Sequence, residues 1–342
     1  MARGKKPGNE VFTAIESTLV LHPAFVAANK RVEQVFRRSQ VSLEPVCLSI
    51  HGESRTGKST VLEEFRLPHP TTRHDYGLEV PVLQVSTPAE PTVMGLVELM
   101  LLEIGDPRNY VGTKYQKTTR LIKLMAATQT RVVCIDEFQH FVDKSSFKVL
   151  HHVADWLKVL VDEANVGLVV AGLTRCQAVI RQNEQLRGRF LAPVVMPRFD
   201  WESEQSRQQF IAILASFHES MSRYFDVPRF DTEEMGFRFY VGCGGLIGYL
   251  AKFLNQLVWN AGEAGKKVIT LRDMHKAHTQ AVFVIEGPRA CPRPFTRQFE
   301  PQPESQAMLA AARRVGVEAE PGVPNGRTSK KRRLTVNDVL KA

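Results

Sequence analysis

Short apolar runs alternate with stretches of helical spacing over residues 22–200. Four runs are expected to form buried strands, at 46–50, 82–85, 131–135 and 166–171. Apolar residues recur at helical spacing between and before them, at 22–36, 58–66, 93–104, 114–127 and 149–160. Strands that are apolar throughout and alternate with helices are typical of a parallel sheet covered on both faces. We therefore predict an α/β domain over 22–200.

A second pattern begins near Glu202, where the strand-like runs stop and only helical periods remain. Apolar residues recur at 210, 213, 214 and 217 and again at 250, 253, 254 and 257. A further helix is expected from Thr270, where T-L-R-D matches a capping box. We predict a helical domain over 201–286, an N-terminal arm over 1–21, and a flexible linker and tail over 287–342. Within the linker, one short helix is expected around 305–314.

Composition excludes several classes of protein. With 43% hydrophobic residues in 342, the chain can build a sizeable core, so wholesale disorder is excluded. No run approaches the roughly 18 apolar residues of a membrane span, and the basic start has no apolar segment behind it, so no secretory signal is expected. The five cysteines are scattered, which favours buried thiols in a reducing cytoplasm over disulfides or a zinc site.

The positive charge is concentrated at the two ends of the chain. The formal net charge is +9. Residues 287–342 contribute +6, and the segment 3–6 contributes the remaining +3. The body is therefore close to neutral, and any contact with nucleic acid must come from a local patch.

A phosphate-binding loop follows the first predicted strand. Gly52-Glu-Ser-Arg-Thr-Gly-Lys-Ser matches the pattern at every fixed position, with a helix expected to follow. In such a loop, backbone N–H groups surround phosphate oxygens, the lysine reaches the terminal phosphates, and the hydroxyl of Ser59 ligates Mg²⁺. The predicted nucleotide-binding residues are Gly52, Glu53, Ser54, Arg55, Thr56, Gly57, Lys58, Ser59 and Thr60. The alternative, an ordinary Gly-rich turn, does not explain the strand and helix on either side.

Two adjacent carboxylates end the third predicted strand. Asp136 and Glu137 follow Arg131-Val-Val-Cys-Ile. A buried carboxylate there is costly without a cation, so we expect Asp136 to hold magnesium through water. Glu137 is then placed to take a proton from the attacking water, which favours hydrolysis of a nucleotide. Ordinary acids at a strand end are the alternative.

Three further polar side chains are candidates for the same site. Thr174 follows the fourth strand, where its hydroxyl could orient water or the terminal phosphate, or merely cap a helix. Arg187 and Arg189 lie in Leu-Arg-Gly-Arg-Phe, and either could reach across a subunit boundary to the terminal phosphate. An exposed, solubilising arginine is the alternative, and the sequence does not choose between the two.

Over about residues 22–286 the chain resembles an AAA+ ATPase. It contains, in this order, a phosphate loop, an Asp-Glu pair, a polar sensor, an L-R-x-R-F segment and a helical lid. His-Pro-Ala-Phe at 22–25, the phosphate loop, and Ile-Asp-Glu-Phe-Gln-His at 135–140 are similar to the TnsC/TniB transposition regulators. The chain departs from many AAA+ lids at Ile247, where a G-x-x-R context would place a sensor arginine. This departure is more typical of a slow switch than of a fast motor.

The resemblance implies a prokaryotic cytoplasmic protein that binds ATP and Mg²⁺ and polymerises on duplex DNA. It would link a target-selection complex, often of the TniQ type, to a DDE transposase, and ATP hydrolysis would disassemble it. In CRISPR-associated relatives the target selector is an RNA-guided complex. Two other functions stay open: an AAA+ loader or remodelling ATPase acting on a protein partner, and a nucleotide-sensing scaffold, for example in phage defence, without appreciable turnover.

Basic residues recur every three positions in 113–123. Lys114, Lys117, Thr118 and Arg120 lie near a predicted helix start and are candidates to contact DNA phosphates. A solvated basic helix face is the alternative. The basic run at 330–333 could contact the transposase, bind DNA, act as a nuclear signal or only solubilise the tail. His140, His151 and His152 come without a ligand set, so no metal site is predicted there.

Overall fold

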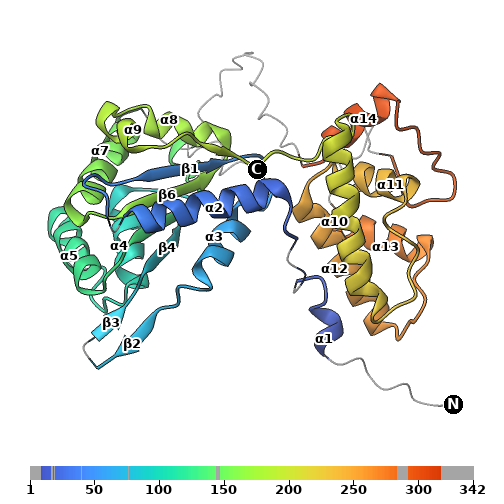
Figure 1. The fold of residues 1–342 in the computed structure, drawn as a ribbon, viewed down its shortest axis with the longest axis horizontal. Coiled ribbons are helices and arrows are strands. Elements are labelled where there is room, and N and C mark those ends of the chain that lie inside the picture. Colours follow the sequence, from blue (N-terminus) through green and yellow to red (C-terminus); the bar gives the residue numbers. More distant parts are fainter. Residues whose placement is uncertain are drawn as a thin grey trace, which may run out of the picture.

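The computed structural model describes residues 9–316, except Ser17, Leu19, Gln40, Tyr76, 144–146 and 283–291. The described chain forms an α/β lobe and a helical lobe that lie side by side (Figure 1). Among the described residues, no helix combines the length and hydrophobicity needed to cross a bilayer.

The α/β lobe is built on a parallel sheet of five strands in the order β4-β5-β6-β1-β7. These strands are β1 (Cys47–His51), β4 (Val82–Ser86), β5 (Val132–Asp136), β6 (Gly167–Gly172) and β7 (Val194–Val195). The four predicted strands are confirmed. Two features were missed: β7, which is too short to show a period, and an antiparallel pair, β2 (Thr72–His74) and β3 (Gly77–Glu79), in the predicted loop.

Helices cover both faces of this sheet, as predicted. One face packs on α2 (Pro23–Arg38) and α3 (Lys58–Arg66), and the other on α4 (Val93–Glu103), α5 (Lys114–Ala127) and α7 (Phe147–Ala164). Neighbouring residues of one strand enter opposite cores: Val133 and Ile135 pack on one side, Val132 and Cys134 on the other. Strand side chains alternate between faces, so a strand buried on both sides must be apolar at every position.

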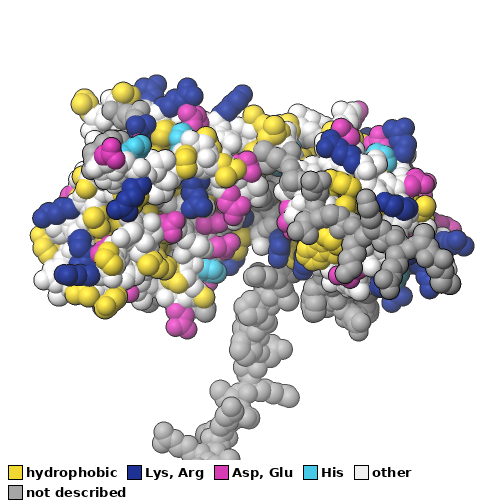
Figure 2. Space-filling model, turned by 90° about the horizontal axis from the view of Figure 1, so that it is seen from below, with side chains coloured by type: hydrophobic (Ala, Val, Ile, Leu, Met, Phe, Trp, Pro, Cys, Tyr) yellow, Lys and Arg dark blue, Asp and Glu magenta, His cyan; other side chains and the backbone are white. Residues whose placement is uncertain are grey.

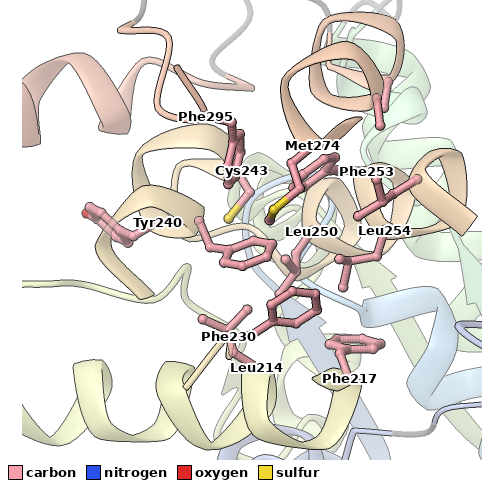
Figure 3. Packing of buried hydrophobic residues seen from close by; sticks show 14 of the residues in the cluster. Leu214, Phe217, Phe230, Tyr240, Cys243, Leu250, Phe253, Leu254, Met274 and Phe295 are labelled. Carbon is pink, nitrogen blue, oxygen red and sulfur yellow. The ribbon is translucent and has the colours of Figure 1, made fainter. Parts of the chain in front are cut away.

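The helical lobe consists mainly of α10 (Glu204–Ser222), α11 (Glu233–Cys243), α12 (Ile247–Glu263) and α13 (Leu271–Ala281). Its core is rich in phenylalanine, and Phe217, Phe230, Phe253 and Phe295 converge with aliphatic side chains of several helices (Figure 3). The predicted capping box is present at the start of α13, where Thr270 and Asp273 bond each other's backbone N–H groups.

Both ends of the described chain also pack into this lobe. Val11 of α1 (Asn9–Phe12) and Ile15 just after it belong to its core, and so do Leu309 and Ala312 of α14 (Gln306–Arg313). The predicted short helix is thus present, but residues 292–316 are packed rather than a flexible linker. Periodicity could not reveal this because residues 292–305, the described part of the chain just before α14, contain no helix or strand. The basic run at 330–333 lies outside the described residues.

A buried arginine holds the irregular segment in place. Arg238 of α11 is only 6% exposed, and its guanidinium donates to the carbonyls of Pro294, Thr296 and Phe299 at 2.6, 3.2 and 3.2 Å. It also donates to Glu234 at 3.0 Å. The backbone carbonyls of a segment outside any helix or sheet lack regular hydrogen-bond partners, so they need donors such as this guanidinium. This explains how a Pro-rich stretch becomes part of the helical lobe.

Candidate functional site

The phosphate loop connects β1 to α3 and lines a cavity of about 490 Å³. The loop depends on glycine at two points. Gly57 caps α3 with a φ of 94°, and a Cβ on Gly52 would lie 2.1 Å from the carbonyl oxygen of Met196. Of the predicted nucleotide-binding residues, those that line the cavity are Ser54, Arg55, Gly57, Lys58, Ser59 and Thr60. The N-terminus of α3 therefore points its free backbone N–H groups into this cavity, an arrangement that suits an anion.

Lys58 is buried within the loop. Its ammonium donates to the carbonyls of Gly52 and Glu53 at 3.1 and 2.6 Å. Burial lowers the pKa of Lys58, while the nearby carboxylates of Glu137 and Asp136 oppose this shift. Lys58 thus lies close enough to both acids for their charges to interact.

The two carboxylates differ in their surroundings. Asp136 ends β5 and is 8% exposed, and among the described residues its carboxylate accepts one hydrogen bond, from the Glu137 N–H at 2.8 Å. Glu137 lies in the cavity wall with a strained φ of 53°. Magnesium takes oxygen ligands and usually few of them from protein, so the carboxylate of Asp136 and the hydroxyl of Ser59 fit it. Among the described residues, no three His, Cys, Asp or Glu side chains lie together as a metal-binding group.

Gln139 connects these acids to the neighbouring strand. Its amide N–H donates to the carboxylate of Glu137, and its amide oxygen accepts from the Leu173 N–H at 3.0 Å, just beyond β6. The side chain is 5% exposed and lines the cavity. Gln139 therefore sets the orientation of Glu137, a role that its position two residues after the acid pair did not reveal.

The outer wall of the cavity differs from the prediction at the polar sensor. Thr174 is exposed at the start of the 3₁₀ turn η1 (Thr174–Cys176) and is not among the lining residues. Its neighbour Arg175 does line the cavity and forms an ion pair with Asp143, with one N···O distance of 3.0 Å. A cationic group thus stands where a hydroxyl was expected.

The helical lobe closes over the phosphate loop. The N–H of Gly248, in the first turn of α12, donates to the carbonyl of Arg55 at 2.9 Å. The guanidinium of Arg55 lies 5.4 Å from the centre of the Tyr249 ring, a cation–π contact that accompanies the unusual φ of 68° at Arg55. A Cβ on Gly248 would lie only 3.1 Å from that carbonyl, so glycine permits this close approach.

A second cavity, of about 460 Å³, adjoins the first. Gly57, Thr60 and Gly248 line both, so the two spaces meet at the start of α3. The second space lies between the chain before α2, helix α3 and the helical lobe. Much of its wall is apolar, including Val20, Phe25, Phe217, Ile247 and Ala251. The position that a sensor arginine would occupy thus carries an apolar wall residue, Ile247.

The structure separates the two candidate arginines of α9 (Glu184–Arg189). Arg189 is held within its own subunit by ion pairs with Glu44 and with Asp162, the latter at 3.3 Å, and its side chain is 21% exposed. Arg187 is 59% exposed, and its one ion pair with a described residue is with Glu184, at 3.7 Å. Arg187 is therefore the one free to reach another molecule.

The predicted DNA-contacting stripe is largely wrong. Lys117 is 3% exposed and paired with Glu98, and Thr118 is 9% exposed and accepts from the indole N–H of Trp156 at 3.2 Å. Arg120 pairs with Asp106 at 2.7 Å and donates to two carbonyls of the loop before α5. Of the four residues, only Lys114 is exposed. The three-residue spacing rotates around the helix, so successive positions turn into the core.

The family-model comparison identifies the first part of the chain. Residues 13–201, more than half of the chain, match the model described as Bacterial TniB protein. No curated protein sequence matches the chain.

Solved structures are similar to it in fold. The ORC2 protein of Aeropyrum pernix, solved in ADPNP-ADP complexes, has a TM-score of 0.57 at 13% identity, with 80% of this chain and 72% of that one covered. Cdc6p of Pyrobaculum aerophilum has a TM-score of 0.58 at 13% identity, with 82% and 73% covered. The Aeropyrum pernix ORC1 protein in complex with DNA has a TM-score of 0.53 at 12% identity, with 79% and 69% covered.

These likenesses confirm the predicted AAA+ architecture of a parallel sheet followed by a helical lobe. Together with the family match, they identify the chain as a member of the bacterial TniB protein family with an AAA+ fold.

Proposed function

We propose that this protein is an ATP-dependent regulator of DNA transposition that assembles on duplex DNA and is disassembled by ATP hydrolysis. The observation that carries the proposal is the cavity over the phosphate loop, where Lys58 and Glu137 face the same space beneath the helical lobe. The nucleotide-bound ORC2 structure and the TniB match support it.

The residues of the cavity divide the chemistry of hydrolysis among them. Lys58 neutralises charge on the terminal phosphates, and Glu137, oriented by Gln139, takes the proton of the attacking water. Mg²⁺, held by Ser59 and Asp136, would supply charge neutralisation at the phosphate oxygens. Arg175 would add a positive charge at the outer wall, in place of the expected role of Thr174.

In the assembled form, ATP would lie in the interface between two subunits and contact both. Arg187 is exposed and almost unpaired, so it is available to reach the terminal phosphate held by a neighbouring copy. Because that contact exists only while the terminal phosphate is present, hydrolysis would weaken the interface between the two subunits.

DNA contact would come from the loop between α4 and α5 and the first residues of α5 rather than from the whole predicted stripe. Arg108, Tyr110, Lys114 and Tyr115 are all exposed there, and Tyr110 and Tyr115 are 71% and 79% exposed. Basic and hydrophobic side chains also lie interspersed on the outer part of the α/β lobe in Figure 2, whereas most acidic ones on that face gather beside the helical lobe. Cationic groups beside exposed rings suit sequence-tolerant contact with phosphates and sugars. The ORC1 structure with DNA supports this choice of ligand.

The remaining proposed partners are those that the family resemblance implies. A TniQ-like target-selection protein and a transposase would bind the assembled form, and the tail after residue 316 is the proposed contact for the transposase. Because the assembled state would exist only with ATP, the target-selection protein and the transposase would be brought together only where this protein has assembled, at a selected target.

Electron microscopy of the full chain with ATP and a duplex of random sequence tests the proposal. Rings or filaments that need both ligands, and that Lys58→Ala abolishes, are expected. Glu137→Gln should give assemblies that persist, because they cannot turn over ATP. Monomers under all conditions at low salt would refute the proposal, and phosphate release stimulated by a protein partner but not by DNA would favour a loader instead.

A further inference from the structure

Two segments of the helical lobe that are far apart in the sequence meet at one end of the lobe. Asp226, in the loop after α10, bridges to the chain before α13: its N–H donates to the carbonyl of Lys267 at 2.7 Å, and its carbonyl accepts from the N–H of Ile269 at 2.9 Å. Helix α12 separates this end from the phosphate loop, because its first turn contacts Arg55 and its 17 residues rise about 25 Å. The end lies at the bottom of the helical lobe in Figure 1, whereas α5 lies on the far side of the other lobe.

This end of the lobe carries an excess of positive charge. Two surface hollows there share Lys267 in their walls. Six basic residues and two acidic ones line them: Arg223, Arg229, Lys266, Lys267, Arg272 and Lys276, with Asp226 and Asp273. We call these residues the basic surface. Residues 7–286 have no net charge, so an excess of four positive charges at one end of the helical lobe is a local feature that only the fold creates.

Half of the cations on the basic surface are available to a ligand. Three of the six are paired, with Glu219, Asp231 and Asp273. The other three, Lys267, Arg272 and Lys276, are exposed and form no ion pair with any residue that the structure describes. Arg272 and Lys276 are four residues apart and so share one face of α13. Like charges held close together repel one another, so a ligand with several negative charges would stabilise them.

We propose that the basic surface is a second DNA-binding surface, which holds phosphates of a duplex away from the loop between α4 and α5. The inference rests on the proposed function, which places DNA at that loop. Of the large apolar side chains that line the basic surface, only Val268 is exposed, at 55%. The centre of a protein–protein interface is depleted of charged residues, whereas protein–DNA interfaces are polar and strongly positive. The basic surface therefore suits a duplex better than a protein, and one subunit would contact DNA with both lobes.

Fluorescence anisotropy of the full chain with ATP and a duplex of random sequence, over a salt series, tests the proposal. The triple variant Lys267→Ala, Arg272→Ala and Lys276→Ala should bind the duplex roughly 10-fold more weakly than the parent. Its slope of log affinity against log salt should be smaller by about three, one for each lost phosphate contact. ATP affinity should stay within about 2-fold of that of the parent, because the phosphate loop lies at the other end of α12. Lys276→Ala alone, with a slope smaller by about one, serves if the triple variant does not fold.

The matched control removes the same charge from the other lobe. Lys30, Arg37 and Arg38 are exposed on α2, and the triple alanine variant of these residues should keep the slope of the parent. Adding Lys114→Ala to the variant of the basic surface should weaken binding by the same factor as in the parent, since the two sites lie on different lobes.

Three outcomes would contradict the proposal. A variant of the basic surface that matches the control in affinity and slope would overturn the second site and leave the loop between α4 and α5 in place. Loss of polyglutamate binding in that variant, with unchanged DNA binding, would assign the basic surface to an acidic protein segment instead. No DNA binding by the parent would overturn the DNA contact of the proposed function itself.

Discussion

Arg198 joins the phosphate loop to the helical lobe through the carboxylate of Glu53. Its Nε donates to Glu53 Oε1 at 2.7 Å, and its Nη1 donates to the carbonyls of Gly244 and Arg313 at 3.1 and 2.9 Å. The side chain is 13% exposed. One guanidinium therefore contacts the phosphate loop, the end of α11 and the end of α14.

Arg198→Ala should lower the free energy of unfolding by about 1–3 kcal/mol, because a carboxylate and two carbonyls lose their donor. Urea denaturation followed by circular dichroism measures this change. Arg223→Ala is the control, since Arg223 is 67% exposed with a single partner and should cost less than about 0.5 kcal/mol. Equal, small losses in both variants would contradict the bridging role of Arg198.

Gln139→Ala should reduce the rate of phosphate release by roughly 10- to 100-fold, because Glu137 loses the group that orients it. ATP affinity should change little, since Gln139 acts on the general base and not on the phosphates. A coupled phosphate-release assay and direct binding separate the two effects. Glu137→Gln gives the lowest expected rate, and a Gln139→Ala rate equal to that of the parent would exclude the positioning role.

Arg187→Ala should affect assembly, whereas Arg189→Ala should affect the stability of the subunit. The first should prevent ATP-dependent assembly with a change in stability below about 0.5 kcal/mol, because its pair with Glu184 is exposed. The second should destabilise the subunit by about 1–3 kcal/mol, because Glu44 and Asp162 lose their partner. Light scattering with ATP and thermal unfolding measure these outcomes. Assembly that survives in Arg187→Ala but fails in a folded Arg189→Ala would reverse the assignment.

Lys117 and Lys114 provide a similar contrast on α5. Lys117→Met should destabilise the subunit by about 1–3 kcal/mol, because the buried ammonium of Lys117 no longer pairs with the partly exposed carboxylate of Glu98. Lys114→Ala should leave stability unchanged but weaken DNA binding and reduce its salt dependence by about one phosphate contact. Fluorescence anisotropy over a salt series measures the second effect. An unchanged salt slope in Lys114→Ala would argue against DNA contact at the loop before α5.

The helical lobe should lose stability in mild acid through His278. The ring is 4% exposed, and Nε2 lies 2.9 Å from the carbonyl of Gly242, to which the neutral ring donates. Burial lowers the pKa of His278 below its ordinary value of 6.5, although the bond to Gly242 opposes the shift. The unfolded chain therefore binds the proton more readily, so this contribution is complete above pH 6.5 and is lost as the pH falls below it.

Thermal unfolding between about pH 7.5 and 5 measures this effect, and His278→Gln should flatten the profile because glutamine does not titrate. The exposed His152 provides the control substitution, His152→Gln, which should leave the profile as it is. A parent profile that His278→Gln does not alter would assign the acid sensitivity to other groups.

Residues of the candidate site could be predicted to different extents. Lys58, Ser59 and Asp136 belong to local patterns in which each residue is placed by its own strand or helix. Gln139, Arg175 and Arg198 were missed, because each acts through a contact with a distant segment that no spacing encodes. The clue for Gln139 was present in Phe-Gln-His after the acid pair, but its contact with Leu173 depends on β5 and β6 lying side by side.

By itself, the sequence determined the order of strands and helices, the phosphate loop, the acid pair and the family resemblance, because these depend on periodicity and on residues close together in the chain. The tertiary structure alone decided that Lys117 is buried, that Arg187 rather than Arg189 is free, and that residues 223–229 and 266–276 form one basic surface. It also decided that both ends of the described chain complete the helical lobe. Each of these depends on which face of an element meets another, and that is set by packing across the whole chain.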